Sequence, residues 1–133
     1  RLDIAIVYSA YTTKMIFNIG IDIEQISRFE KCSPKILDKI LTKKEIKNAK
    51  NKNAQRLAGI FCAKEAVIKA CNPAEKLHFQ DIEILHNKDG SPYAVIKSKK
   101  IISKNLKISI SHSGNCAVAA AMLLIGDKKS TRK

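Results

Sequence analysis

The chain has 133 residues, of which 45% are hydrophobic and 28% are charged, which is the composition of one globular domain with a core. It contains no apolar run near the roughly 18 residues that a membrane span requires and no clear signal peptide, so we expect a soluble protein. The net charge of +13 predicts an acidic partner: a nucleic acid, a membrane surface, a phosphorylated ligand or an acidic protein. Only charge supports nucleic acid, because the tyrosines are not interleaved with the basic runs as stacking platforms would be.

The four cysteines, Cys32, Cys62, Cys71 and Cys116, are scattered along the chain. They form no C-x-x-C pair and stand near no histidine cluster, which argues against a zinc site. Single cysteines of this kind are typical of a reducing compartment, so we expect the protein to be cytoplasmic.

The start of the chain has mixed chemistry, and a regular pattern begins at Met15. We expect residues 1–14 to be an extension or a cloning remnant and residues 15–126 to form the domain. We expect residues 127–133 to be a basic disordered tail.

Residues 16–26 alternate between apolar and polar side chains, which predicts a strand with one apolar face. The other face carries Asp22 and Glu24. The simplest interpretation is a half-buried strand whose polar face meets water. Carboxylates are poor strand formers, however, and Gly20 leaves room for a ligand to approach the backbone, so this face is also a candidate site.

Two short basic helices are predicted next. Ser33-Pro34 is a typical helix entry, and the following apolar stripe ends at Leu41. Thr42 and Glu45 have the spacing of a capping box, which starts a second helix. Lysines cover the remaining surface, and such a charge run is usually a solvated face.

Residues 57–71 carry apolar side chains at helical spacing, which predicts a central helix that buries one face. Lys64 falls on the apolar row, where we expect its stem to cover the rim and its ammonium to reach water. Glu65 and Lys69, one helical turn apart, are either an exposed ion pair or part of a site.

The C-terminal half is predicted to be mainly β-structure. Residues 79–85 and 92–97 alternate on either side of a glycine turn, which predicts a hairpin. We expect a short basic helix over 98–105. Residues 106–112 and 116–124 predict a second hairpin, with its turn at Ser113-Gly114-Asn115.

Polar chemistry is concentrated in three of these stretches, around Asp22, around Glu65 and around His112. One strand carboxylate and one helix carboxylate, without a cysteine or histidine cluster, are suited to Mg²⁺, which keeps several waters and prefers phosphate as a further ligand. The neighbouring lysines could neutralise phosphate charge.

Together and in this order, these stretches resemble holo-acyl-carrier-protein synthase, the small single-domain group of the phosphopantetheinyl transferase superfamily. The resemblance lies in residues 15–23, in Phe61-Cys62-Ala63-Lys64-Glu65-Ala66, in residues 79–84 and in Ser109-Ile110-Ser111-His112, and it extends from Met15 to about Leu124. It implies an α+β fold in which an antiparallel sheet packs against a long central helix. It also implies a homotrimer with active sites between protomers.

The resemblance implies transfer of the phosphopantetheine arm from coenzyme A to a serine of apo acyl carrier protein, with Asp22, Glu65 and Lys69 as the catalytic residues. The two carboxylates would hold Mg²⁺ against the coenzyme A pyrophosphate, and Lys69 would balance the pyrophosphate charge. Lys64 would do the same or contact an outer phosphate. The adenosine end would be lined by Ser111 and His112. No side chain is assigned as the base that deprotonates the serine.

The resemblance also gives the basic surface a partner, because acyl carrier proteins of this system are acidic. Arg28 individually, and Lys31 and Lys35 with the lysines that follow, would meet the carrier protein. No nucleic-acid or membrane partner is then expected.

Two departures from the family pattern leave alternatives open. Ile60 stands where the family commonly has arginine, and the loop over residues 72–78 lacks the usual glycines, for which Lys76 is a candidate to compensate. An inactive relative that binds coenzyme A is one alternative. A basic module that binds polyanions is the other, although it leaves the two carboxylates unexplained.

Overall fold

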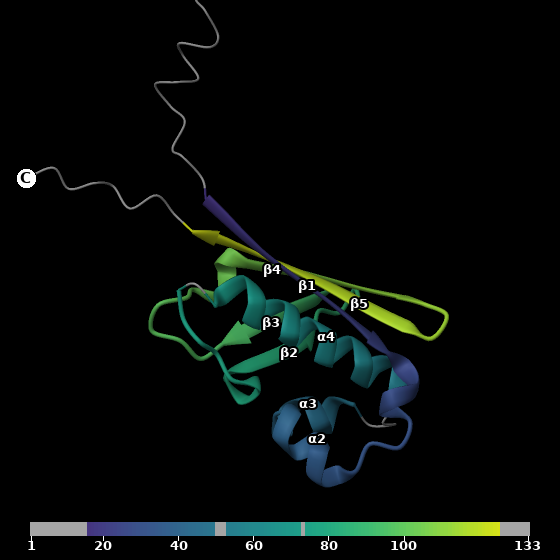
Figure 1. Cartoon of the computed structure of the whole chain (residues 1–133). Coiled ribbons are helices and arrows are strands. Elements are labelled where there is room, and N and C mark those ends of the chain that lie inside the picture. The colour runs from purple at the N-terminus through teal and green to yellow at the C-terminus, as the bar shows by residue number, and fades with distance from the viewer. Residues whose placement is uncertain (1–15, 50–52, 73, 126–133) are drawn as a thin grey trace, which may run out of the picture.

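The computed structural model describes residues 16–49, 53–72 and 74–125 (Figure 1). The elements in chain order are β1 (Ile16–Gln25), the 3-10 helix η1 (Ile26–Phe29), α2 (Pro34–Ile40), α3 (Lys43–Asn48), α4 (Ala54–Cys71), η2 (Phe79–Asp81), β2 (Ile82–His86), β3 (Pro92–Ile96), η3 (Ser103–Asn105), β4 (Leu106–Ser113) and β5 (Cys116–Ile125). The α+β class is confirmed. The expected extension and tail lie outside the described residues. None of the described helices is both long and apolar enough to cross a membrane.

The strands form two antiparallel sheets around the central helix. The larger sheet has the order β1-β5-β4, and the smaller one is the hairpin of β2 and β3. Helix α4 lies along one face of the larger sheet, and the small hairpin packs against both α4 and β4 (Figure 1). The core is formed mainly between α4 and the larger sheet, where alternate alanines of β5 from Ala117 to Ala121 are buried. The expected packing of an antiparallel sheet on a long central helix is confirmed.

Strand β1 presents its polar face, and not its apolar face, to α4. Gly20 makes this possible, because a Cβ at this position would lie 1.9 Å from the backbone oxygen of Ala66. The isoleucines on the opposite face are exposed, with Ile19 at 72%, Ile21 at 61% and Ile23 at 64%. The interpretation of a half-buried strand whose polar side meets water is therefore wrong, and the carboxylates of β1 lie against the helix.

Lys64 is completely buried, so the expectation that it reaches water at the rim is also wrong. Its ammonium forms an ion pair with Glu45 of α3, which is buried as well. It also donates to the backbone oxygen of Ile40 at 2.7 Å and to that of Phe79 at 3.1 Å. The full set of acceptors offsets the cost of burying this charge and ties α4 to both short helices.

The short helices have the predicted caps. The Ser33 hydroxyl accepts from the backbone N–H of Ile36, and the capping box of Thr42 and Glu45 is complete. Glu45 in addition accepts the backbone N–H of Ile84 at 2.9 Å, which fastens α3 to β2.

Two predicted elements differ in extent. The first strand of the small hairpin begins at Ile82 instead of residue 79, because the Asp81 carboxylate accepts the backbone N–H of His78 and closes a 3-10 turn first. The helix expected over residues 98–105 is reduced to η3, because the Ser98 hydroxyl accepts two successive backbone N–H groups and forms a turn instead.

Candidate functional site

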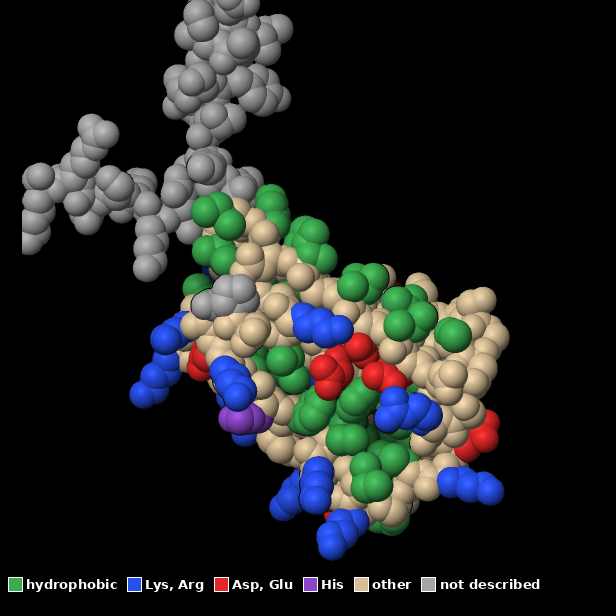
Figure 2. Space-filling model, in the orientation of Figure 1, with side chains coloured by type: hydrophobic (Ala, Val, Ile, Leu, Met, Phe, Trp, Pro, Cys, Tyr) green, Lys and Arg blue, Asp and Glu red, His purple; other side chains and the backbone are tan. Residues whose placement is uncertain are grey.

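A cluster of carboxylates lies where β1 meets α4. Asp22 and Glu24 project from the polar face of β1, and Glu65 comes from the helix. The Oδ2 atom of Asp22 is buried and has no hydrogen-bond partner among the described residues. Figure 2 shows acidic side chains gathered on this face, with Lys or Arg side chains on either side. A buried carboxylate oxygen without a partner is costly, so this atom is suited to a cation.

Lys69 completes this cluster from the next turn of α4. Its ammonium donates to the backbone oxygen of Ile21 at 2.9 Å and lies 3.4 Å from Oδ1 of Asp22. The side chain is half exposed, so its ammonium can move to a ligand. The structure thus brings together all three residues that the sequence proposed as catalytic.

The carboxylates raise the pKa values of their neighbours. The pKa of Glu65 is raised, first by burial and then by the negative charge of Asp22, while Lys69 acts in the opposite direction. The pKa of Glu24 is raised by burial and by Asp22 as well, with Arg28 opposing. The site therefore favours either an added proton or an added cation.

The donor set fits Mg²⁺. Carboxylate oxygens are ligands that this ion prefers, and it usually binds one or two of them together with water and phosphate. No three acidic, histidine or cysteine side chains in the described part of the chain are arranged to enclose an ion without other ligands. Asp22 and Glu65 could thus hold a magnesium ion whose remaining ligands come from solvent and substrate.

Glu24 was not among the residues assigned a role from the sequence, although the alternation placed it beside Asp22. It forms an ion pair with Arg28, with Nη1 and Oε2 2.8 Å apart. Arg28 is exposed on η1, and Lys31 and Lys35 follow it as exposed side chains at the entry to α2. The candidate partner surface is therefore next to the carboxylate cluster and is linked to it through Glu24.

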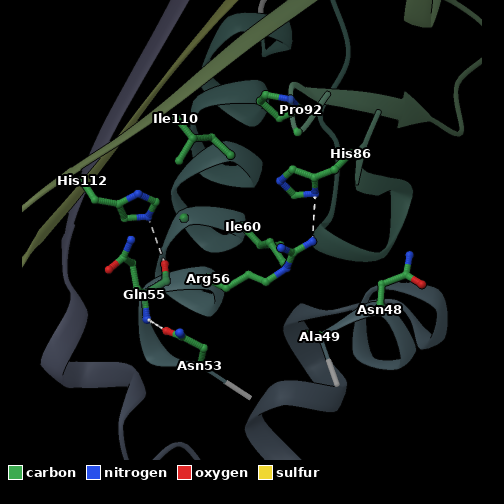
Figure 3. Close-up of a pocket in the computed structure, with 12 residues that line it drawn as sticks. Asn48, Ala49, Asn53, Gln55, Arg56, Ile60, His86, Pro92, Ile110 and His112 are labelled. Atoms are coloured by element: carbon green, nitrogen blue, oxygen red, sulfur yellow. Dashed lines mark hydrogen bonds between the residues drawn. The ribbon is translucent and has the colours of Figure 1, made fainter. Parts of the chain in front are cut away.

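A second candidate site is a pocket of about 590 Å³ between the first turns of α4, strand β4 and the small hairpin (Figure 3). His112 of β4 lines it and contacts the backbone oxygen of Gln55 at 3.0 Å. Arg56 of α4 lines it too, with Nη2 3.3 Å from Nδ1 of His86 in β2. Sequence reasoning missed Arg56 and His86, because they lie 30 positions apart and belong to no local motif.

Two residues assigned to coenzyme A from the sequence are not brought to this pocket. Ser111 precedes His112 on β4, and side chains alternate along a strand, so it points to the sheet face opposite α4. Lys64 is buried with its three acceptors and does not face either candidate site. The expectation that Lys64 contacts a phosphate is therefore wrong.

The carboxylate cluster and the pocket lie on opposite sides of α4. Arg56 and Glu65 are nine positions apart, which is about two and a half helical turns, so their side chains leave the helix in opposite directions. None of the residues that line the pocket belongs to the carboxylate cluster. The two sites therefore face different sides of the same helix.

Comparison with known proteins identifies the family to which this chain belongs. The model of the 4'-phosphopantetheinyl transferase superfamily matches residues 18–121, which include Asp22, Glu65 and His112. The holo-[acyl-carrier-protein] synthase of Caldicellulosiruptor saccharolyticus is 42% identical over 118 residues, covering 81% of this chain and 96% of that protein. The synthase of Fusobacterium nucleatum is 39% identical over 122 residues, covering 83% and 100%. The chain therefore belongs to the holo-[acyl-carrier-protein] synthases of this superfamily.

Solved structures agree with this assignment. A crystal structure of a holo-(acyl-carrier-protein) synthase from Bacillus anthracis in complex with CoA (3',5'-ADP) matches with a TM-score of 0.70 and 36% identity, covering 83% of this chain and 97% of that one. The Helicobacter pylori synthase in complex with coenzyme A matches with a TM-score of 0.69 and 35% identity, covering 80% and 99%. The resemblance drawn from the sequence motifs is confirmed.

Proposed function

We propose that this enzyme transfers the phosphopantetheine arm of coenzyme A to a serine of apo acyl carrier protein for fatty acid synthesis, releasing adenosine 3',5'-bisphosphate. The observation that carries the proposal is that Asp22, Glu65 and Lys69 lie close together in a chain of this family. The four cysteines are free, which suits a cytoplasmic enzyme. The test is whether apo carrier protein gains one phosphopantetheine arm.

In this mechanism Asp22 and Glu65 would hold Mg²⁺ at the site where the pyrophosphate of coenzyme A binds. The ion, when bound, supplies positive charge to the phosphate that leaves. Lys69 turns its half-exposed ammonium from the backbone oxygen of Ile21 to the pyrophosphate and neutralises part of its charge. Asp22 on β1 and Glu65 on α4 are partly buried between the strand and the helix, which keeps the carboxylates in position while the phosphopantetheine arm is transferred.

The adenosine end of coenzyme A is proposed to occupy the pocket that His112 lines. Because this pocket and the carboxylates lie on opposite sides of α4, the complete active site needs the pocket of one protomer beside the carboxylates of another. An exposed apolar face on the larger sheet supports such an assembly, since Ile19 is in register with Met122 and Ile21 with Ala120. An apolar face of this kind on a soluble enzyme marks a contact between chains. We propose the trimer on these grounds.

The assembly can be tested by placing a charge on the apolar face. We expect Ile19→Lys to convert the trimer to monomers and to abolish most of the transfer activity, because the complete site is then lost. Multi-angle light scattering during size exclusion measures the mass. Val95→Lys is the matched control, since Val95 is an exposed apolar residue on the other sheet. A monomeric wild-type enzyme that is fully active would contradict the proposal.

The carrier protein is proposed to bind the basic surface formed by Arg28, Lys31 and Lys35. We expect the double variant Lys31→Glu/Lys35→Glu to raise the KM for carrier protein by about 10-fold and to leave kcat nearly unchanged, because exposed charges act mainly on encounter. The increase should shrink as the salt concentration rises. Steady-state kinetics with varied carrier protein measure both effects.

The control for this surface is Lys99→Glu/Lys100→Glu, which makes the same change of net charge at two exposed lysines beyond the small hairpin. If the control raised the KM for carrier protein as much as Lys31→Glu/Lys35→Glu did, overall charge and not this surface would attract the carrier.

A further inference from the structure

The C-terminal end of α2 has no cap of its own. The last carbonyl groups of an α-helix lack partners within the helix, and a glycine or asparagine that follows often helps to satisfy them. Here Leu41 ends α2, with its N–H bonded to the oxygen of Leu37, and Thr42 is already the N-cap of α3. The carbonyl groups of residues 38–41 therefore need donors from elsewhere in the fold.

Two side chains from other elements supply these donors. Lys64 of α4 donates to the oxygen of Ile40. The side-chain amide of Gln80, in η2, serves the other three oxygens, those of Asp38 at 3.0 Å, Lys39 at 3.4 Å and Leu41 at 2.8 Å. Each of the four carbonyl groups thus has a donor, and three of them depend on one glutamine.

Helix α2 depends strongly on these bonds. It has seven residues, and a helix of this length is not stable alone in water. Leu37 is its buried residue, and η2 is the element against which it mainly packs. Figure 1 shows α2 beside α3 and apart from the larger sheet. The amide of Gln80 therefore fixes where α2 lies.

The position of α2 matters because the proposed carrier surface extends onto it. Lys35 stands exposed in its first turn and Lys39 in its last, and Lys43 and Lys44 follow at the start of α3. A surface that must be ordered when its partner binds gives a lower affinity than one that is already in place. A capped α2 presents these lysines in one arrangement.

We propose that Gln80 is a positioning residue for the carrier protein: by capping α2 it holds the basic surface in the conformation that the carrier binds. This inference rests on the proposed function, because it assumes that the carrier meets this surface. Gln80 acts through α2 and touches neither coenzyme A nor the metal.

The kinetic test removes the donor and keeps the length of the side chain. We expect Gln80→Met to raise the KM for carrier protein by about 3- to 10-fold, because hydrogen bonds to α2 are lost, and to leave kcat and the KM for coenzyme A unchanged. The increase should persist at high salt, since no charge is changed. Gln80→Lys, compared at high salt, should recover most of the loss because its ammonium can donate to the same oxygens.

Hydrogen exchange shows whether the effect arises at α2. Gln80→Met should speed the exchange of the α2 amides and leave that of α4 unchanged. Ser98→Ala is the matched control, because it also removes three hydrogen bonds, with Glu75, Lys100 and Ile101, in the loop after β3. It should change neither the exchange of α2 nor the KM for carrier protein.

Calorimetry separates this inference from the proposed function, because apo carrier protein can be titrated without coenzyme A and without transfer. Wild-type protein should bind the carrier about 3- to 10-fold more tightly than Gln80→Met, whether or not an arm is transferred afterwards. Equal affinities, an equal loss in Ser98→Ala, or no binding by the wild-type protein would overturn the inference. Faster exchange of α2 with unchanged affinity would overturn it as well.

Discussion

Asp22→Asn and Glu65→Gln will each lower kcat/KM for carrier modification by about 10³-fold, because a bound metal supplies several kcal/mol of charge stabilisation that a neutral amide cannot hold in place. Stability should not fall. Asp22 and Glu65 lie in one cluster in which the negative charge of Asp22 contributes to the raised pKa of Glu65, so removal of either charge relieves repulsion. We expect the Tm of each variant without metal to equal or exceed that of the wild-type protein.

Two measurements check this prediction together. Steady-state kinetics give kcat/KM, and thermal unfolding with and without Mg²⁺ gives the stabilisation by the ion, which both variants should lose. Asp38→Asn is the control, because it neutralises an exposed carboxylate on α2 that does not belong to the cluster. Normal turnover by both Asp22→Asn and Glu65→Gln would show that the metal assignment is wrong.

Lys64→Met will destabilise the fold by about 3–5 kcal/mol, because it leaves the carboxylate of Glu45 buried without its partner. The backbone oxygens of Ile40 and Phe79 lose a donor in the same change. Urea unfolding followed by circular dichroism measures the free energy. Lys69→Met is the matched control, since Lys69 is half exposed on the same helix and should cost little stability.

The double variant Lys64→Met/Glu45→Gln separates the buried charge from the loss of packing. The amide that replaces the carboxylate at position 45 carries no charge, and its oxygen can accept the backbone N–H of Thr42 or of Ile84. We therefore expect the double variant to recover most of the stability lost in Lys64→Met. If Lys64→Met alone stayed within about 1 kcal/mol of the wild-type protein, the ion pair would not have the role that we assign to it.

The order of the elements could be predicted because local patterns determine them. The alternation of β1 and the capping box of Thr42 and Glu45 are features of neighbouring residues, and both are present as expected. The environment of Lys64 could not be predicted in this way. Its partner Glu45 comes from another helix, so the helical spacing showed an unusual lysine but not the acid that it would meet.

The direction in which β1 faces has a similar explanation. The sequence of one chain does not indicate whether an apolar row is covered by its own core or by a second copy. The position of Asp22 against the helix and the exposure of Ile21 were therefore not predicted. The carboxylate cluster was predicted through family resemblance, since Asp22 and Glu65 are far apart in the sequence. Arg56 and His86 belong to no motif, and only the fold brings them to one pocket.

The most direct test of the proposed transfer is the mass of an apo acyl carrier protein after incubation with this enzyme, coenzyme A and Mg²⁺. We expect the mass of the carrier protein to rise by one phosphopantetheine arm. This gain should disappear when a chelator is added, when Asp22→Asn replaces the wild-type enzyme, and when the acceptor serine of the carrier protein is replaced by alanine. If several apo carrier proteins gained no mass although the enzyme bound coenzyme A, the chain would be an inactive relative. If it bound no coenzyme A and bound nucleic acid in a salt-sensitive manner, it would be a polyanion-binding module.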